Sequence, residues 1–270
     1  MAKGLSPLAV WGLARELKFA AQETRPLLVS GALSEQLAKE LSGGAEPGAV
    51  RVGGRVEDAA CLIRILAGAP SEEDEQELRA AKRAKVPVVA VQTGTEDFEI
   101  PYVLATDVVK CRPGEGFPID EIAAAVAARL GEAGTGLTAR VPVLREPLCR
   151  AMIESFARRN GILGVAIFVP GADFPVLTLN QVRLVLRLAA AHGVEIDQKR
   201  VPEVLATVAA GFGFRAFARQ LLGAIPFGGW VVKGGVAYGG TRALGEGAWR
   251  YFQAQVTESA GADPVTRQDP

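Results

Sequence analysis

Between residues 25 and 139, short runs of consecutive apolar residues alternate with stretches of helical periodicity. Strands that lack a hydrophobic–polar alternation are buried on both faces, which is typical of a parallel sheet covered by helices. This half of the chain is therefore predicted to be an α/β layer with a mainly parallel sheet. The predicted strands are 27–29, 49–52, 60–66, 86–91 and 107–109, and the predicted helices are 34–41, 71–85 and 118–130.

Residues suited to capping stand at two of the predicted helix starts. Ser34 can cap the helix at 34–41 with its side-chain oxygen. Ser71, with Asp74 three residues later, resembles a capping box in which Asp replaces the usual Glu or Gln. The acidic first turn of this second helix suits the positive end of the helix dipole. Both starts support the alternation of strands and helices in this half.

The second half of the chain is predicted to be helical. Residues 131–136, GEAGTG, are the predicted linker. A capping box at Thr178 and Gln181 predicts a helix from 178 to 191 that Gly193 ends. Another helix is expected at 147–159 and a possible strand at 165–169. Residues 200–249 are expected to form helical pieces broken near 211–213 and 226–229.

These elements predict two domains with flanking segments, which a chain of 270 residues can accommodate. The fold class is α/β plus all-α, with a mainly parallel sheet layer followed by a glycine-rich helical module. The predicted ranges are 25–137 for the α/β domain, 141–252 for the helical module, 1–24 for an N-terminal helix and 257–270 for a disordered polar tail.

Charge and cysteine usage narrow the classes of function. Lys+Arg and Asp+Glu both count 30, whereas a nucleic-acid binder normally has a basic excess, so no nucleic acid is predicted as a partner. The three cysteines are far apart and His192 is the single histidine, so no metal site is predicted and buried reduced thiols are expected. An apolar fraction of 49% and 31 glycines, clustered in the last third, leave both cytosol and membrane open as locations.

The loops where an α/β nucleotide-binding domain holds its ligand lack the residues for it. A phosphate-binding P-loop needs G-x-x-x-x-G-K-[ST], but residues 30–35 contain one glycine and no lysine. The guanine-reading N-K-x-D of GTPases is replaced by QTGT at 92–95, and Lys110-Cys111 stands in place of Ser-Ala. In order, these loops resemble an Era-like GTPase domain without its nucleotide contacts. We therefore expect no bound nucleotide, no other cofactor and no catalytic residues. His192, the one possible triad histidine, is expected at a helix C-terminus.

The second half carries a series of motifs at 179–190 (LNQVRLVLRLAA), 211–215 (GFGFR), 218–221 (ARQL), 225–230 (IPFGGW) and 233–245 (KGGVAYGGTRALG). In these residues, and across 160–252, the chain resembles the bacterial family called domain of unknown function 697. The resemblance implies a protein that occurs alone or joined to an Era-like GTPase domain. It also implies a location in the bacterial inner membrane for several members, and no established catalytic residues.

Small residues and cations at helical spacing are the candidate contact residues. Gly235, Gly239, Ala243 and Gly247 recur every four positions, so on a helix they form a stripe along which another backbone can approach, in lipid or within the protein. The spaced cations can reach lipid headgroups or bind acidic partners. These cations are Arg183, Arg187, Arg215, Arg219 and Lys233.

A bilayer span needs about 20 mostly uncharged residues. Residues 161–179 come close but contain Asp173 and two prolines. We expect a non-catalytic bacterial protein at the inner face of the cytoplasmic membrane. Its C-terminal helices would contact lipid, and its α/β half would contact a cytoplasmic partner. The alternative is a soluble pseudo-GTPase-type regulatory module whose apolar helices are buried in the fold or in a homo-oligomer.

Overall fold

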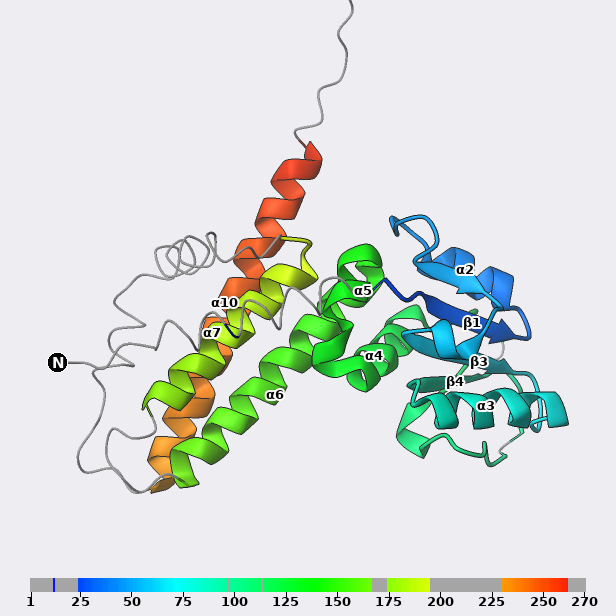
Figure 1. The fold of residues 1–270 in the computed structure, drawn as a ribbon, viewed down its shortest axis with the longest axis horizontal. Helices are drawn as coiled ribbons and strands as arrows, with labels where there is room; N and C mark the ends of the chain where they lie inside the picture. The colour runs from blue at the N-terminus through cyan, green and yellow to red at the C-terminus, as the bar shows by residue number, and fades with distance from the viewer. Residues whose placement is uncertain are drawn as a thin grey trace, which may run out of the picture. The chain divides into compact units, whose positions relative to one another are not determined.

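A computed structural model describes residues 12, 24–96, 98–112, 114–166, 174–194 and 230–261 of the chain. The chain divides into two compact units, of which one spans residues 19–151 and the other contains the described residues from Met152 onward. The first unit is α/β and the second is helical (Figure 1). The predicted N-terminal helix lies outside the described residues apart from residue 12.

The α/β unit is built on one parallel sheet, so its predicted strands and their parallel arrangement are confirmed. Its strand order is β2-β1-β3-β4-β5, which is a doubly wound order. The chain leaves β1 for β2 on one side and then crosses to β3 on the other, so the topological switch point lies between β1 and β3. The strands are β1 (Leu27–Gly31), β2 (Val50–Val52), β3 (Cys61–Leu66), β4 (Val88–Gln92) and β5 (Val108–Lys110).

Helices cover both faces of this sheet. Helices α2 (Ser34–Leu41) and α4 (Ile119–Leu130) pack on one face, and α3 (Glu72–Ala84) packs on the other. In β3 the side chains of Cys61, Ile63 and Ile65 face α2 and α4, whereas Leu62 and Leu66 face α3. Because both faces are covered, the strands can be apolar without alternation, as the sequence pattern indicated.

The two predicted caps in this unit had different outcomes. The capping box of α3 is confirmed, since the Asp74 amide donates to Ser71 Oγ (3.2 Å) and the Ser71 amide donates to Asp74 Oδ2 (2.7 Å). The prediction that Ser34 caps α2 is wrong. The cap residue is Leu33, at φ 57°, and its side chain makes no cap hydrogen bond. The chain turns back directly after β1, where the Ala32 amide bonds to the Ile65 carbonyl, so Ser34 is already helical.

The predicted linker at 131–136 is also wrong, because this segment is helical and part of the α/β unit. Residues Gly131–Gly134 form a 3-10 turn, and Thr135–Arg140 form helix α5. A second 3-10 turn follows at Pro142–Leu144. Leu137, Val141 and Leu144 are buried in the core beneath α2 and α4. Burial of these three side chains outweighs the flexibility of the local glycines.

Three helices make up the described part of the second unit: α6 (Arg145–Ala166), which begins in the first unit, α7 (Phe174–Ala191) and α10 (Trp230–Gly261). Helix α7 begins four residues before Thr178, so the capping box predicted there is wrong as a start. Its predicted end is confirmed. Gly193 has φ +78°, its amide bonds to Ala190, and the Val194 amide bonds to Ala189, which is a Schellman motif.

Two further predictions for this half need correction. Residues 165 and 166 belong to α6, so the strand considered at 165–169 does not begin there, and 167–169 lie outside the described residues. Helix α10 continues through Gly261, so the disorder predicted from residue 257 is wrong for 257–261. The helical pieces predicted between 200 and 229 lie outside the described residues.

We predict that Gly31→Ala destabilises the protein far more than Gly53→Ala. Both glycines have positive φ, 92° and 65°, which costs an alanine about 1–2 kcal/mol. A Cβ at Gly31 would also lie 2.1 Å from the Ile65 carbonyl oxygen, whereas one at Gly53 would meet nothing within 4 Å. Urea unfolding should show a loss of about 3 kcal/mol or more for Gly31→Ala. Equal losses for the two variants would contradict this packing.

Candidate functional site

A concave site in the α/β unit lies at the switch point of the sheet. An open pocket of about 510 Å³ is formed by the ends of β1 and β3 and by the first turn of α3. In doubly wound sheets, ligands bind beyond the carboxyl ends of the strands at such a switch point. The lining residues include Gly31, Arg64, Ser71, Glu73 and Asp74.

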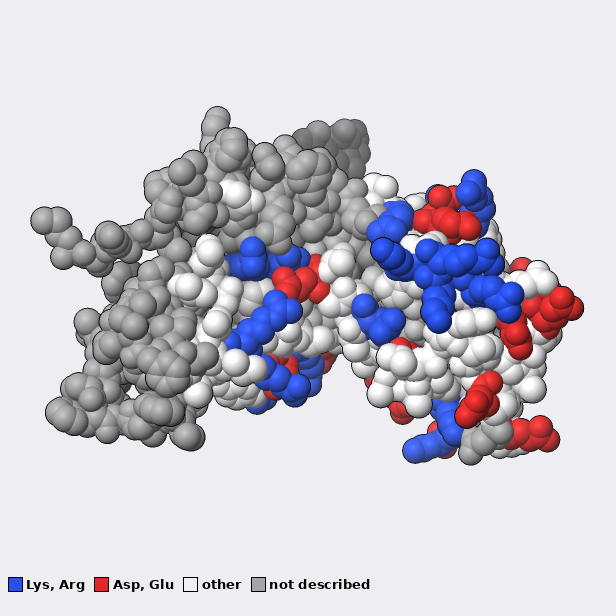
Figure 2. Space-filling view, turned by 60° about the horizontal axis from the view of Figure 1, so that its bottom comes forward, with Lys and Arg blue, Asp and Glu red and all other residues white. Residues whose placement is uncertain are grey.

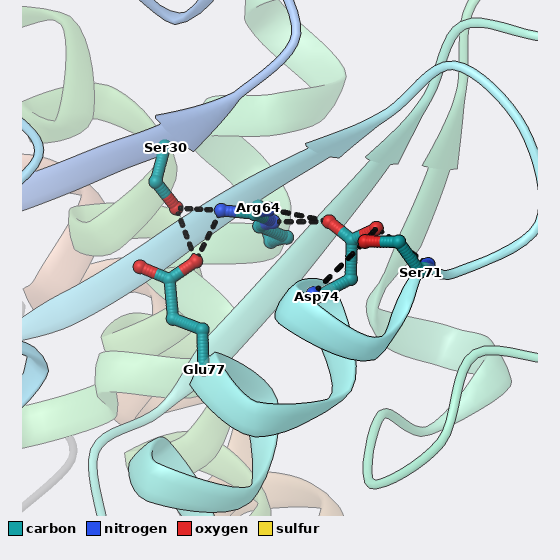
Figure 3. Close-up of polar contacts among 5 residues, drawn as sticks. All are labelled: Ser30, Arg64, Ser71, Asp74 and Glu77. Carbon is teal, nitrogen blue, oxygen red and sulfur yellow. Dashed lines mark hydrogen bonds and ion pairs between the residues drawn. The ribbon is translucent and has the colours of Figure 1, made fainter.

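Arg64 is the unexpected residue of this site, because it lies in the central strand β3 among apolar neighbours and is only 8% exposed. Its guanidinium donates to Asp74 Oδ1 (2.8 Å from Nε), to Ser30 Oγ (3.2 Å from Nη1) and to Glu77. The Ser30 hydroxyl in turn donates to Glu77 (2.8 Å). Figure 3 shows the guanidinium between the two carboxylates of α3, with Ser30 on β1 and Ser71 at the helix start.

Opposite charges stabilise this network inside the protein. A buried guanidinium is costly unless it is paired and hydrogen-bonded, and both carboxylates supply those bonds. Burial by itself would raise the pKa of the Asp74 carboxyl. Hydrogen bonds from the Ser71 hydroxyl and amide, together with Arg64, outweigh it and lower that pKa below its ordinary value. Asp74 therefore stays ionised and connects the helix cap to the central strand.

This arrangement is poorly suited to phosphate chemistry. The start of a helix beside a switch-point pocket can hold an anion, but here Asp74, a carboxylate of the protein itself, already accepts the Ser71 amide. The guanidinium beneath the pocket is bonded to Asp74, Glu77 and Ser30. No lysine lines the pocket. Within the described residues, no group of three or more His, Cys, Asp or Glu side chains is placed to hold a metal ion.

The three loops compared with GTPase loops meet at the same edge of the sheet. Gly31 ends β1, Gln92 ends β4, and the Cys111 amide after β5 bonds to the Gln92 carbonyl at 2.8 Å. The Thr93 hydroxyl bonds back to the Leu66 carbonyl (3.4 Å). Parallel strands bring these loops together, as their order in the sequence indicated. The Cys111 amide and the Thr93 hydroxyl in these loops bond to the protein itself.

The cysteines and the histidine carry no sign of reactivity. Burial raises the pKa of the Cys61 and Cys149 thiols to about 12, so both stay protonated, and Cys111 is half-buried. His192 lies at the end of α7, as expected, with Nδ1 2.7 Å from the Leu188 carbonyl oxygen and its ring against Phe252.

Three of the four residues in the predicted small-residue stripe of α10 face away from the described helix contacts. Gly235, Gly239 and Ala243 are exposed, and a Cβ at either glycine would meet no atom within 4 Å, whereas Gly247 is buried. Other glycines make the contacts among the described helices. A Cβ at Gly234 would lie 2.5 Å from Val165, and one at Gly245 would lie 2.8 Å from Ile153. A packing role for the predicted stripe stays a prediction for contacts outside the described residues.

The predicted contact cations are placed differently from one another. Arg183 is half-buried and Arg187 is only 6% exposed, so the Arg187 side chain lies within the helical unit. Lys233 lies in α10, but its side chain is outside the described part of the chain, as are Arg215 and Arg219 entirely. The structure does not bring the five cations together on one described surface.

A polar layer joins the three helices of the second unit. Asn160 of α6 and Thr241 of α10 are fully buried, and the Asn160 amide donates to Thr241 Oγ1 at 2.8 Å. From α7, Asn180 donates to Asn160 Oδ1 (2.9 Å) and Gln181 donates to Thr241 (3.3 Å). Neither the residues of this layer nor Arg64 were among the site residues predicted from the sequence. The sign of them in the sequence was a polar residue within a stretch otherwise predicted to be buried.

Beyond the polar layer, one end of the helical unit exposes apolar side chains. Helix α10 runs parallel to α7, as the pairs Gln181–Thr241 and His192–Phe252 show, and antiparallel to α6. The end of α6 and the starts of α7 and α10 therefore lie together. Here Ile162 is 68% exposed, Val165 39%, Val176 43% and Val236 43%. Among the described helices, none combines the length and the apolar character needed to cross a bilayer.

Comparisons with protein-family models, with curated proteins and with solved structures gave no match.

We predict that Arg64→Met costs about 3 kcal/mol of stability at neutral pH, the low end of the range for a buried ion pair, because it leaves two partly buried carboxylates without their cation. The double variant Arg64→Met/Glu77→Leu should regain part of this loss. The Asp74 carboxyl has a lowered pKa in the folded protein, so its ionised form stabilises the fold. This stabilisation is complete above about pH 4 and is lost as pH falls through the lowered pKa. The difference in the free energy of unfolding between wild type and Arg64→Met should therefore become smaller in acid. Urea unfolding across pH measures both effects, and a difference that stays constant would contradict the ionic role of the network.

Proposed function

We propose that this chain is a non-catalytic bacterial protein that attaches to the inner face of the cytoplasmic membrane through its helical unit and presents its α/β unit to a cytoplasmic partner. The observation that carries the proposal is the group of exposed apolar side chains at one end of the helical unit. This apolar end consists of Ile162, Val165, Val176 and Val236.

The surroundings of the apolar end suit a lipid interface. Exposed Arg158, Arg159 and Arg242 lie within about two helical turns of it, where long cationic side chains can reach headgroups while their stems cover apolar surface. Complete burial of each apolar side chain contributes about 1.5–3 kcal/mol, and a cation near an anionic surface about 1 kcal/mol. Arg158 and Arg242 contribute less, because each already pairs with a glutamate. Because the apolar side chains are only partly exposed, the summed free energy of these contributions is modest and supports reversible attachment.

For the α/β unit, we propose a GTPase-like layer that has lost nucleotide chemistry and serves in recognition. Support comes from the switch-point pocket, where Asp74 accepts the Ser71 amide and Arg64 is engaged by Asp74 and Glu77. A P-loop places a lysine and a hydroxyl on phosphate and Mg²⁺, and the turn after β1 offers neither arrangement.

The alternative is a soluble regulatory module, and the polar layer of the helical unit favours it. Asn160 and Thr241 are fully buried and hydrogen-bonded, so the register of the three helices is set inside the protein and does not require lipid. In that case a partner protein or a second copy of the chain would cover the apolar end.

We predict that the full chain floats with vesicles of mixed zwitterionic and anionic phospholipid. The variant Ile162→Asp/Val176→Asp should float about tenfold less, because each carboxylate resists transfer from water. Val52→Asp is the matched control, since Val52 is 46% exposed on the edge strand of the α/β unit. A wild-type chain that stays in the soluble fraction with native circular dichroism, or a double variant that floats like wild type, would contradict membrane attachment.

We also predict that titration of GTP or ATP with Mg²⁺ into the protein gives no binding heat in calorimetry, with a functional GTPase as positive control. The reason is the absence of a phosphate-binding lysine from the residues lining the switch-point pocket. A saturable heat that disappears in Gly68→Val, a change in the pocket lining where an added Cβ would meet nothing within 4 Å, would show that the pocket does bind nucleotide and would refute the recognition role.

A further inference from the structure

Helix α3 carries opposite charges on its two halves. Its first half holds Glu72, Glu73, Asp74, Glu75 and Glu77. Its second half and cap hold four exposed cations, Arg79, Lys82, Arg83 and Lys85, which we call the α3 basic half. The helix dipole explains why acids stand first and cations last. It does not explain how these cations are oriented.

The cations of the α3 basic half differ from other exposed arginines in their partners. Arg150, Arg158 and Arg242 each form an ion pair with a glutamate one helical turn away. None of the four α3 cations forms an ion pair with a described residue. Glu75 stands four residues before Arg79, a favourable spacing for such a pair, yet Arg79 turns elsewhere.

Arg79 and Lys82 lie against Tyr102. The Lys82 ammonium is 4.9 Å from the centre of the ring and the Arg79 guanidinium is 5.9 Å from it. Arg79 Nε also donates to the Tyr102 hydroxyl at 3.3 Å. Tyr102 itself has φ +67° and is 44% exposed. A non-glycine residue in this conformation costs about 1–3 kcal/mol, and such strain clusters at functional positions.

Together these residues make a cationic surface with an exposed aromatic ring. Figure 2 shows Lys and Arg side chains gathered on one face of the α/β unit, with acidic side chains toward the rim of that face. Tyr and Arg are the residues over-represented at the energetic centres of protein interfaces. The ring is held in place by two cations before any partner arrives, so little conformational entropy remains to be lost on binding.

We propose that the α3 basic half, with Tyr102, is the surface through which the α/β unit recognises its partner, and that the partner presents an acidic protein segment. This inference rests on the proposed function, in which the α/β unit faces a cytoplasmic protein. Carboxylates of the segment pair with Lys82, Arg83 and Lys85, and Tyr102 contacts its backbone or apolar side chains. Charge complementarity of this kind steers association and makes it dependent on salt.

The acidic first half of α3 favours a protein segment over a membrane surface or a nucleic-acid duplex. Helix α3 has 13 residues and is therefore about 20 Å long. A flat anionic membrane or a duplex presents negative charge over that whole length and would also meet Glu72, Glu73 and Glu75. Charges are screened beyond about 8 Å in physiological salt, so a short acidic segment on the basic half avoids most of this repulsion.

Fluorescence anisotropy with a labelled oligoglutamate peptide and the full chain tests the proposal. We expect binding that weakens as KCl is raised, and no binding of an oligoglutamine peptide of the same length. Lys82→Glu/Arg83→Glu should lower the affinity at least about tenfold. Lys39→Glu/Arg51→Glu makes the same change in net charge at exposed sites outside this surface and should bind like wild type.

Tyr102→Gly removes the ring without adding backbone strain, because glycine adopts positive φ without cost. A loss of affinity in this variant is therefore due to the missing ring. We expect this variant to bind the peptide several-fold more weakly while its unfolding midpoint does not fall. An unchanged affinity would show that Tyr102 is structural and would contradict its place in the surface.

Three results would overturn the proposal. The first is a peptide that does not bind, or that binds Lys82→Glu/Arg83→Glu and wild type equally. The second is vesicle or duplex-DNA binding that this double variant loses, which would assign the surface to a polyanion. The third is self-association that it loses, which would assign the surface to a second copy. Flotation through Ile162 and Val176 is a separate measurement, so failure of membrane attachment and failure of this surface can be told apart.

Discussion

The burial of Arg64 in the central strand is the constraint on which the α/β unit depends. Strand β3 has sheet neighbours on both sides and helices on both faces, so a guanidinium there, only 8% exposed, is largely removed from water and needs partners within the protein. Asp74 and Glu77, one turn apart on α3, supply them. The requirement sets both the position and the rotation of α3 on the sheet, since another register of the helix would leave a buried charge unpaired.

The same interaction decides the chemistry of the switch-point pocket. Asp74 serves two neighbours, the helix cap at Ser71 and the strand residue Arg64. A doubly wound fold places its helix starts and strand ends together, which is the usual setting for a phosphate site. Here the strongest local donors are engaged by carboxylates of the protein. Recognition by the outer face of α3, where the cations are exposed, is more consistent with this arrangement than chemistry at the strand ends.

The helical unit follows a different principle, in which polar groups set the register and apolar groups remain at one end. Asn160, Asn180, Gln181 and Thr241 connect three helices, and Gly234 and Gly245 let the backbones approach closely. Past this layer the side chains at the junction of the helix ends are apolar and partly exposed. A unit that satisfies its buried polar groups internally while exposing aliphatic side chains at one end is suited to attachment to an apolar surface.

Local signals in the sequence were sufficient for much of the fold. Continuous apolar runs placed the inner strands β1, β3 and β4, because strands buried on both faces must be apolar throughout, and shorter runs placed the edge strands β2 and β5. The Ser71–Asp74 cap and the Gly193 stop rest on interactions within one turn. Features that depend on distant residues were not predictable. Leu137, Val141 and Leu144 turn an apparent linker into core, the turn after β1 makes Leu33 rather than Ser34 the cap of α2, and Gly234 and Gly245 of α10 make close contacts with α6.

For the candidate site too, some features followed from the sequence and others from the tertiary structure. The sequence by itself determined which part of the P-loop motif is missing after β1, because a lysine that residues 30–35 do not contain cannot be supplied by folding of that loop. Only the tertiary structure decided that Arg64 would be neutralised by Asp74 and Glu77, and that Arg79 and Lys82 would hold Tyr102. Those partners are separated along the chain, and it is the packing of α3 against the sheet that brings their charges within bonding distance.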